Sequence, residues 1–504
     1  MPRSLMADIN TYVLASGRQR LQAACILVAV LTLLVRLPFI IDPGMSTDSY
    51  AYLDGWPTLE QLAGQGRFGQ FLVFRLFGAL AIDPLTFATL LQGLGIALLG
   101  LSTPLLFAAF STDEQIRLLP LCLAGLVVTL HPYAAEILTF SEASFTALLA
   151  TAMGVVAIYI VARRQARWWI SVALLVAALS MYQLLLNYAC LMILFGALKI
   201  HLRTQAEARW TLAPYRPLFI AAGVLLMSLV IYLVLHKTFV AALGIKEVGR
   251  AAFLPLGQIA ARLEDMRTLT GFLWKRPLLV DYGVAARALL WTTVLCGWAV
   301  LAGYLLRRPR VTVLLPLAVM LLVPWAGIGV VAAGALWWPA PRILGGIVLV
   351  WAMGIYWLAW VACGRWGKRL VAATSAVLLL SFVAVGHRVH SDQQQLNGFD
   401  RLLAQRVYTG LIQLEGYTEQ TPVAVVNSRL KWAHPLPLAT AYMDLNLTAF
   451  ADKRAIKGLL ELSNGRRLQF ALPGEADTRY CEAAATWPQP GFATMQADHA
   501  LVCL

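Results

Sequence analysis

Residues 217–236 read PLFIAAGVLLMSLVIYLVLH, a run of 20 residues without Asp, Glu, Lys or Arg between Arg216 and Lys237. A helix of about 20 residues is ~30 Å long, which matches the hydrocarbon thickness of a bilayer. Because the run has no polar face that could turn toward water, it predicts a helix that crosses a membrane.

The composition of the whole chain agrees with this prediction. Hydrophobic residues make up 60% of the sequence and charged residues 13%, and the mean hydropathy is +0.70. An ordinary soluble protein is about 45–50% apolar and about 25% charged. The net charge of +14 would attract nucleic acid, but most Lys and Arg lie in short clusters between apolar runs, as topology signals do. We therefore expect a lipid bilayer, and no nucleic acid, as a partner.

Further apolar runs divide most of the chain into spans. The sequence predicts an all-α polytopic membrane domain with about eleven transmembrane helices over residues 1–387. Several runs are short for a full span, and we expect these to be tilted helices whose ends lie in a cavity. No small-residue cleavage site follows the first run, so it is interpreted as an anchor. The runs are 24–41, 84–110, 117–131, 143–162, 168–182, 184–200, 217–236, 288–306, 311–331, 343–363 and 370–387.

The basic clusters predict the orientation of these spans. If the N-terminus is cytoplasmic, the connections after even-numbered spans face the cytoplasm, and every short basic cluster then falls on that side, as the positive-inside rule requires. The clusters are Arg117; Arg163, Arg164 and Arg167; Lys199, Arg203, Arg209 and Arg216; Arg307, Arg308 and Arg310; and Arg365, Lys368 and Arg369.

Three longer polar segments fall on the opposite, periplasmic face: a first outer loop at 42–83, a second at 237–287, and a tail at 388–504. The tail contains a helix-like stretch from Asp392 to Gln413, a strand-like stretch at 422–426 and another helix around 453–463. It is therefore interpreted as a small C-terminal α/β periplasmic domain. Cys481 and Cys503 form a disulfide there or remain two free thiols; an oxidising compartment would favour the disulfide.

The first outer loop carries the most informative residues, Asp48 and Asp54 with Trp56 nearby, followed by Arg67. The simpler interpretation is a pair of solvated carboxylates beside an interfacial aromatic belt. The catalytic one is that a carboxylate accepts the proton of an attacking hydroxyl, while an Arg neutralises a departing phosphate. Residues 68–82 are apolar on one side and predict a helix in the plane of the membrane surface.

The second outer loop is basic, although outer loops usually are not. Two interpretations stay open. The loop attracts an anionic lipid carrier or polysaccharide, or it forms a solvated amphipathic helix at the surface.

Four short patches resemble the Gtr-type (GtrII-like) serotype-converting glucosyltransferases, membrane enzymes of the GT-C class that modify bacterial O-antigen. The chain has Glu142 where that family often has Asp, Phe140 where it often has Tyr, and Ser49 where many members carry a second acid. The resemblance covers roughly residues 24–390. The patches are Asp48 with Asp54-Gly55-Trp56 and Gly66-Arg67; His131-Pro-Tyr-Ala-Ala-Glu136 through Phe140 to Glu142; Met181-Tyr182-Gln183; and Pro341-Arg342.

This resemblance implies roles for particular residues. Asp48 would be the catalytic base, with Asp54 in reserve. Arg67 would bind the donor phosphate, with Arg342 as the second candidate. The sugar or acceptor pocket would be lined by Trp56, Glu136, Glu142, Tyr182 and Gln183. The alternative roles are structural: a salt bridge at a helix end for Glu136 and an interhelical hydrogen bond for Gln183.

The resemblance also implies a function. A bacterial inner-membrane hexosyltransferase would move a sugar, expected to be glucose, from undecaprenyl phosphate to a hydroxyl of lipid-linked O-antigen, the polysaccharide of lipopolysaccharide, or another envelope glycan. The spacing of His, Cys and Asp indicates no metal site. We therefore expect no cofactor, with a divalent cation as the alternative.

Two other functions fit a chain of this class. A transporter or flippase of lipid-linked sugars often has two related halves with interrupted helices, and no internal repeat is visible in the sequence. A non-catalytic assembly subunit would need neither Asp48 nor Arg67.

Overall fold

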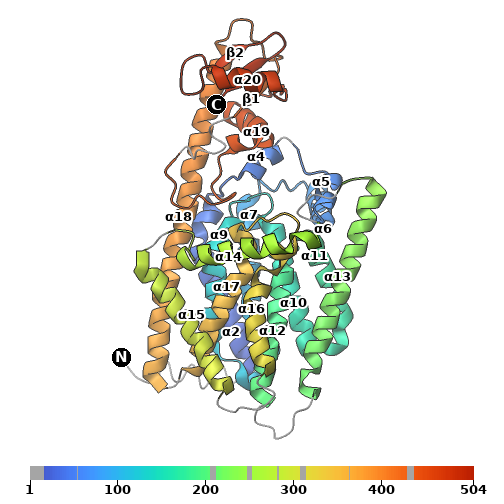
Figure 1. Cartoon of the computed structure of the whole chain (residues 1–504), viewed down its shortest axis with the longest axis vertical. Helices are drawn as coiled ribbons and strands as arrows, with labels where there is room; N and C mark the ends of the chain where they lie inside the picture. The colour runs from blue at the N-terminus through green and yellow to red at the C-terminus, as the bar shows by residue number, and fades with distance from the viewer. Residues whose placement is uncertain are drawn as a thin grey trace.

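The computed structural model describes residues 16–53, 55–204, 212–246, 252–280, 283–306, 314–362, 364–427 and 436–504. Each apolar run predicted from the sequence coincides with a helix. Most of these helices run side by side along the long axis of the molecule (Figure 1). They are α2 (Gly17–Val35), α7 (Ala88–Ala108), α8 (Leu118–Leu130), α10 (Ser144–Arg163), α11 (Trp168–Met181), α12 (Leu185–Thr204), α13 (Arg216–Leu243), α15 (Gly283–Leu306), α16 (Leu314–Ala333), α17 (Gly345–Val361) and α18 (Gly364–Ile412).

Two of these helices are shorter than a bilayer. In the described part of the chain, nine helices are long and apolar enough to cross a membrane, which identifies a multi-pass membrane protein. The helices α8, with 13 residues, and α11, with 14, fall short of that length. They correspond to the runs 117–131 and 168–182 that already looked short in the sequence. The predicted number of about eleven spans therefore stays a prediction.

The first helix lies earlier in the chain than predicted. α2 begins after Ser16, whose hydroxyl accepts the Gln19 backbone N–H, while the Gln19 side chain accepts the Ser16 N–H. This capping box satisfies two N–H groups that would otherwise lack partners, so the helix starts well before residue 24. It ends at Val35, and a separate short helix, α3 (Leu37–Ile41), begins with Pro38 in its first turn. Proline lacks an N–H and favours this new start.

Basic residues gather at one end of the bundle. The Arg117 guanidinium donates to the Trp360 carbonyl at 2.7 Å, at the junction where α8 begins and α17 ends. Arg163, at the end of α10, lies 3.6 Å from Asp113, and the backbone of Asp113 packs against Gly17 at the start of α2. Three of the connections predicted to be cytoplasmic therefore lie together.

The opposite end carries short helices and the tail. The helices α4 (Thr47–Leu53), α5 (Leu59–Gly64), α6 (Phe68–Ala79) and α9 (Pro132–Ile137) lie there. α14 (Ile259–Lys275) runs across the spanning helices at this end, in front of them in Figure 1. The helix predicted for residues 68–82 is thus present as α6.

The longest helix connects the bundle to the tail. α18 has 49 residues, which corresponds to roughly 70 Å at 1.5 Å per residue, and it extends from the basic end to the tail (Figure 1). The boundary expected at 387/388 lies inside this continuous helix. The tail holds a three-stranded sheet in the order β1-β3-β2. β1 (Val423–Val426) pairs parallel with β3 (Ala500–Cys503), and β2 (Ala493–Met495) pairs antiparallel with β3.

The tail has the small α/β fold that its sequence pattern predicted. Its helices are α19 (Lys453–Asn464) and α20 (Glu475–Ala483). A disulfide joins Cys481 of α20 to Cys503 of β3. Of the two alternatives for these cysteines, the structure contains the pair.

Candidate active site

The first outer loop places Asp48 at the start of a helix. The Ser46 hydroxyl accepts the Ser49 backbone N–H at 3.2 Å, which caps α4 and leaves Asp48 in the first turn. A carboxylate is favourable there because it faces the positive end of the helix dipole. The Asp48 side chain is 50% exposed, and its carboxylate accepts a bond of 3.4 Å from Arg454 of α19. The group is thus accessible and only loosely held.

Glu142 lies next to this loop. Its carboxylate accepts the Ser49 hydroxyl at 2.5 Å, and the residue is buried. Burial, followed by the nearby negative charge of Asp48, raises the pKa of Glu142 to about 7, because a carboxylate is poorly solvated in an apolar setting. Asp48 and Glu142 therefore form a coupled pair of carboxylates, one exposed and one buried.

Arg342 is the centre of a second, more buried cluster. Its guanidinium donates to Glu136 at 2.6 Å, and its own backbone N–H donates to the other oxygen of the same carboxylate. A second arm of the guanidinium donates to Asp444 of the tail. The Phe140 ring lies 4.4 Å from the guanidinium carbon, within cation–π range. Three contacts thus fix the direction of Arg342.

Burial raises the pKa of Glu136 to about 7, against the opposing effect of the Arg342 charge. Glu136 is completely buried, whereas the side chains of Arg342 and Asp444 are 11% and 14% exposed. Of the two carboxylates that bind Arg342, only that of Asp444 belongs to a side chain with some exposure to solvent.

Two further predicted residues lie beside this cluster. Tyr182 follows the end of α11, and its ring lies 5.3 Å from the Arg67 guanidinium carbon. Tyr182 also interacts electrostatically with Arg342, Glu136 and Asp444; burial is the main cause of its raised pKa. Arg67 and Arg342 thus both lie close to one phenol, although 275 residues separate them in the sequence.

Gln183 contacts the first outer loop rather than the Arg342 cluster. Its amide nitrogen donates to the Gly66 carbonyl at 2.9 Å, to the Gln65 carbonyl and to the Tyr232 hydroxyl. Gly66 has φ +74°, a conformation that residues with a side chain rarely adopt. These bonds hold the backbone immediately before Arg67. The position of Gln183 matches the interhelical hydrogen bonding that was its structural alternative.

Trp56 packs at the edge of the loop. Its ring lies 5.8 Å from Tyr52 and 6.2 Å from Phe74 of α6, and it is 37% exposed. Asp54, the reserve candidate for the base, lies outside the described residues. The structure thus brings Asp48 near Glu142, Glu136 and Tyr182 near Arg342, and Arg67 near Tyr182. It places Trp56 and Gln183 against the loop itself.

The two clusters are neighbours. The Ser49 hydroxyl, next to Asp48, donates to Glu142. The Phe140 ring, two residues before Glu142, lies 4.4 Å from the Arg342 guanidinium carbon. A hydroxyl bound between the two clusters would have a carboxylate on one side and a guanidinium that can bind phosphate on the other. Within the described ranges, no group of three His, Cys, Asp or Glu side chains could hold a metal ion. The expected independence from metals stays a prediction.

Several residues of the site could not be found from the sequence. Asp444 and Arg454 come from the tail, where they looked like ordinary polar residues of a small domain. The sequence indicated a role for Ser49 only in that many members of the resembling family carry a second acidic residue at this position. Tyr133 is buried beside Glu136 and Tyr442, and its hydroxyl has no hydrogen-bond partner within the described chain.

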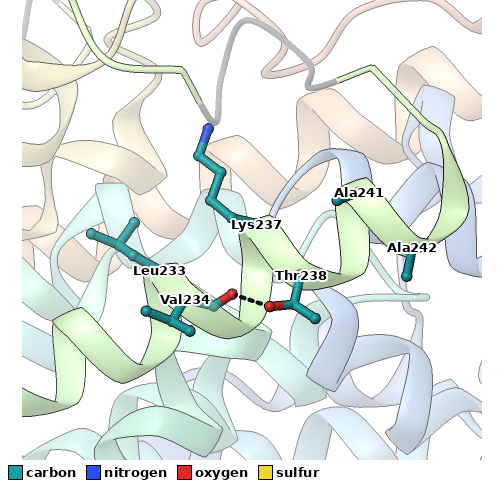
Figure 2. Close-up of a pocket in the computed structure, with 6 residues that line it drawn as sticks. All are labelled: Leu233, Val234, Lys237, Thr238, Ala241 and Ala242. Atoms are coloured by element: carbon teal, nitrogen blue, oxygen red, sulfur yellow. Dashed lines mark hydrogen bonds between the residues drawn. The ribbon is translucent and has the colours of Figure 1, made fainter.

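An open groove of about 770 Å³ lies elsewhere, on α13. Figure 2 shows Lys237 extending away from the other labelled residues and the Thr238 hydroxyl bonded to the Val234 carbonyl. No residue of the two clusters lines this groove, so it is separate from the candidate active site. Its lining consists of Leu233, Val234, Lys237, Thr238, Ala241 and Ala242.

A family model described as Glucosyl transferase GtrII matches residues 37–353. This range contains the described site residues of the bundle, from Asp48 to Arg342, and it ends before the tail. No curated protein and no solved structure matches the chain.

Proposed function

Because the chain belongs to the glucosyl transferase GtrII family, as its sequence motifs predicted, we propose that it transfers glucose from undecaprenyl phosphate to a hydroxyl of O-antigen or another envelope glycan. The observation that carries this proposal is geometric: Ser49, next to Asp48, donates to Glu142, and Phe140, two residues before Glu142, lies against the Arg342 guanidinium. That arrangement provides a proton acceptor and a phosphate-binding cation at one end of a membrane domain.

The proposed reaction is a single displacement. The acceptor hydroxyl oxygen forms a bond to the anomeric carbon of the donor, and the bond between that carbon and the phosphate oxygen breaks. The hydroxyl proton moves to the Asp48 carboxylate, and the electron pair of the broken bond leaves with undecaprenyl phosphate. Arg342 and Arg67 stabilise the negative charge on the phosphate as it departs.

The neighbouring residues support these groups. The Glu136 carboxylate accepts both a guanidinium N–H and the backbone N–H of Arg342. These two bonds limit the motion of the Arg342 side chain. Glu142 accepts the Ser49 hydroxyl, which holds its carboxylate next to the residue that follows Asp48, and burial raises the pKa of Glu142. The Tyr182 phenol and the Phe140 ring both lie beside Arg342, and a phenol and an aromatic ring are the kind of lining that binds a sugar through hydrogen bonds and stacking.

We further propose that this end faces the periplasm of a bacterial inner membrane, with the N-terminus in the cytoplasm. The gathering of Arg117, Arg163 and their neighbours at the opposite end supports this orientation, because basic connections stay in the cytoplasm. The disulfide between Cys481 and Cys503 supports an oxidising compartment for the tail.

Proteoliposomes containing purified protein and undecaprenyl phosphate [¹⁴C]glucose test the reaction. With acceptor glycan outside, we expect label to become covalently attached to the acceptor. Label that crosses the bilayer while still attached to the carrier would support a flippase instead and contradict the proposal.

The same vesicles identify the base. Asp48→Asn should abolish the transfer, whereas Glu60→Gln, which changes an exposed carboxylate of the same loop, should leave it intact. If Asp54→Asn alone abolished transfer, the base assignment to Asp48 would be wrong.

A further inference from the structure

The tail packs directly against α4, the short helix of the first outer loop. Tyr50 of α4 is fully buried among apolar side chains of the tail, including Phe450 and Ile456. Gly458 of α19 packs so closely on α4 that a Cβ there would lie 2.0 Å from the Tyr50 carbonyl oxygen. The helix that carries Asp48 therefore packs against the tail along its length.

Residues 440–449, here called the tail loop, are anchored at both ends to α18. The Thr440 backbone N–H and hydroxyl donate to Asp392 at 2.9 and 2.8 Å. At the other end, the Thr448 hydroxyl and the Ala449 N–H donate to Asp400. Both carboxylates are fully buried, so these bonds are shielded from water and fix the loop firmly.

The apex of the tail loop enters the membrane domain. Tyr442 and Leu445 exchange backbone hydrogen bonds across a tight turn, in which Met443 has φ +54°. Leu445 is 1% exposed and packs in the core of the helical bundle, and the Tyr442 ring stacks 4.7 Å from Phe272 of α14. Asp444, between them, is thereby directed at Arg342.

The two carboxylates on Arg342 differ in how firmly they are held. Glu136 is completely buried and takes both a side-chain and a backbone N–H of Arg342. Asp444 is partly exposed and takes one arm of the guanidinium. Phosphate oxygens bind the same guanidinium N–H groups as a carboxylate does. An entering phosphate would therefore compete with Asp444 rather than with Glu136.

We propose that Asp444 is a positioning residue, which occupies one arm of the Arg342 guanidinium in the empty protein and yields it to the phosphate of the carrier lipid. This inference rests on the proposed function, and it assigns a role to a residue outside the range that the family model matches. Asp444 keeps Arg342 aimed at the site before binding. Its charge also opposes phosphate binding, which limits affinity and favours release of the carrier after transfer.

Binding of undecaprenyl phosphate to the purified full-length protein in nanodiscs tests this role, with the uncharged alcohol undecaprenol as the reference for the lipid chain. Asp444→Asn should bind undecaprenyl phosphate about 5- to 50-fold more tightly than the wild type, because a like charge beside the phosphate is removed. Undecaprenol should bind all variants equally. Asp444→Glu, which keeps the charge, should behave like the wild type.

Two variants separate this effect from a loosened tail. Gly458→Ala disturbs the contact with Tyr50 without removing the Asp444 charge, so it should bind undecaprenyl phosphate less tightly than Asp444→Asn does. Glu419→Gln removes an exposed tail carboxylate that pairs with Arg466, and it should change nothing. An intact disulfide by mass spectrometry confirms that each variant has a folded tail.

Equal or weaker binding of undecaprenyl phosphate by Asp444→Asn would overturn the inference while leaving the proposed function in place. If the wild type bound undecaprenyl phosphate no better than undecaprenol, the proposed function itself would fail, and the role of Asp444 with it.

Discussion

The Arg342 cluster and the Asp48 cluster both pair an arginine with carboxylates, but they differ in burial and in how tightly the charges are paired. Arg342 lies between Glu136 and Asp444 with 11% of its side chain exposed and direct hydrogen bonds to both. Asp48 is half-exposed, and its bond to Arg454 is 3.4 Å long. Burial makes the first cluster rigid and strongly paired, since water does not screen it, whereas the second cluster is weakly paired and free to exchange its partner.

This difference fits a division of labour. A group that binds phosphate benefits from being fixed in advance, because no energy is then needed to order it during the reaction. A group that accepts a proton must be reached by the acceptor, and it must be able to release that proton to water afterwards. The buried cluster suits the first task and the exposed cluster the second.

Removing the charge of Arg342 should have the largest effect on stability. Arg342→Gln leaves Glu136 buried without its cation, which should cost about 3–5 kcal/mol and abolish binding of undecaprenyl phosphate. The melting temperature in detergent and the binding assay measure both effects.

A second change should relieve part of that loss. The double variant Arg342→Gln with Glu136→Gln should be more stable than Arg342→Gln alone, because the buried carboxylate without a partner is gone. It should still fail to bind undecaprenyl phosphate. Arg466→Gln, which breaks an exposed pair with Glu419, serves as the control and should cost less than about 1 kcal/mol. A similar small loss for Arg342→Gln would mean that the cluster is not buried in the bilayer-embedded protein.

Glu142 should produce a pH-dependent effect of intermediate size. Its pKa in the folded protein is raised to about 7, so folding favours the protonated form. Ionising Glu142 therefore lowers the free energy of unfolding. This loss of stability is absent below the pKa of Glu142 in the unfolded chain, grows as the pH rises, and is complete above about pH 7. Glu142→Gln should therefore become more stable relative to the wild type between pH 5 and pH 8.

Melting temperatures of the two proteins across this pH range measure the difference, which should approach about 3 kcal/mol at the alkaline end. Gln can still accept the Ser49 hydroxyl, so the local hydrogen bond is retained. A difference that stays constant with pH would show that Glu142 is ionised throughout.

Arg454 should have the smallest effect. Both Arg454 and Asp48 are at least half-exposed, and such pairs contribute roughly 0.2–1 kcal/mol. Arg454→Gln should leave the melting temperature nearly unchanged and alter the transfer rate by less than about tenfold. Complete loss of transfer would show that Arg454 takes part in the reaction and would remove the contrast between the two clusters.

Much of the fold could be predicted because it depends on local sequence. Charge-free runs such as 217–236 are long enough to cross a bilayer, and the strand-like stretch at 422–426 predicted the strand β1. The start of α2 was placed too late, because the capping box at Ser16 and Gln19 extends the helix through a polar stretch that hydropathy does not recognise.

The site could be predicted only in part, because its contacts cross the chain. The patches around Asp48, Glu136 and Arg342 were visible as motifs, but how close they lie in space depends on the packing of α4, α9 and the turn at Pro341–Leu344 before α17. Asp444 gave no signal, since its role depends on a turn anchored by Asp392 and Asp400 of α18. Gln183 was expected either in the sugar pocket or in an interhelical hydrogen bond, and its amide donates to the backbone of the first outer loop and to Tyr232 of α13.

The central claim is that Asp48 serves proton transfer while Arg342 serves phosphate binding, and one sample of Asp48→Asn tests it most directly. Affinity for undecaprenyl phosphate glucose and the rate of transfer are measured on the same protein in nanodiscs. Affinity should stay within about twofold of the wild type, and the rate should fall by roughly 10²–10⁴-fold. An unchanged rate, or a loss of affinity equal to the loss of rate, would contradict the claim.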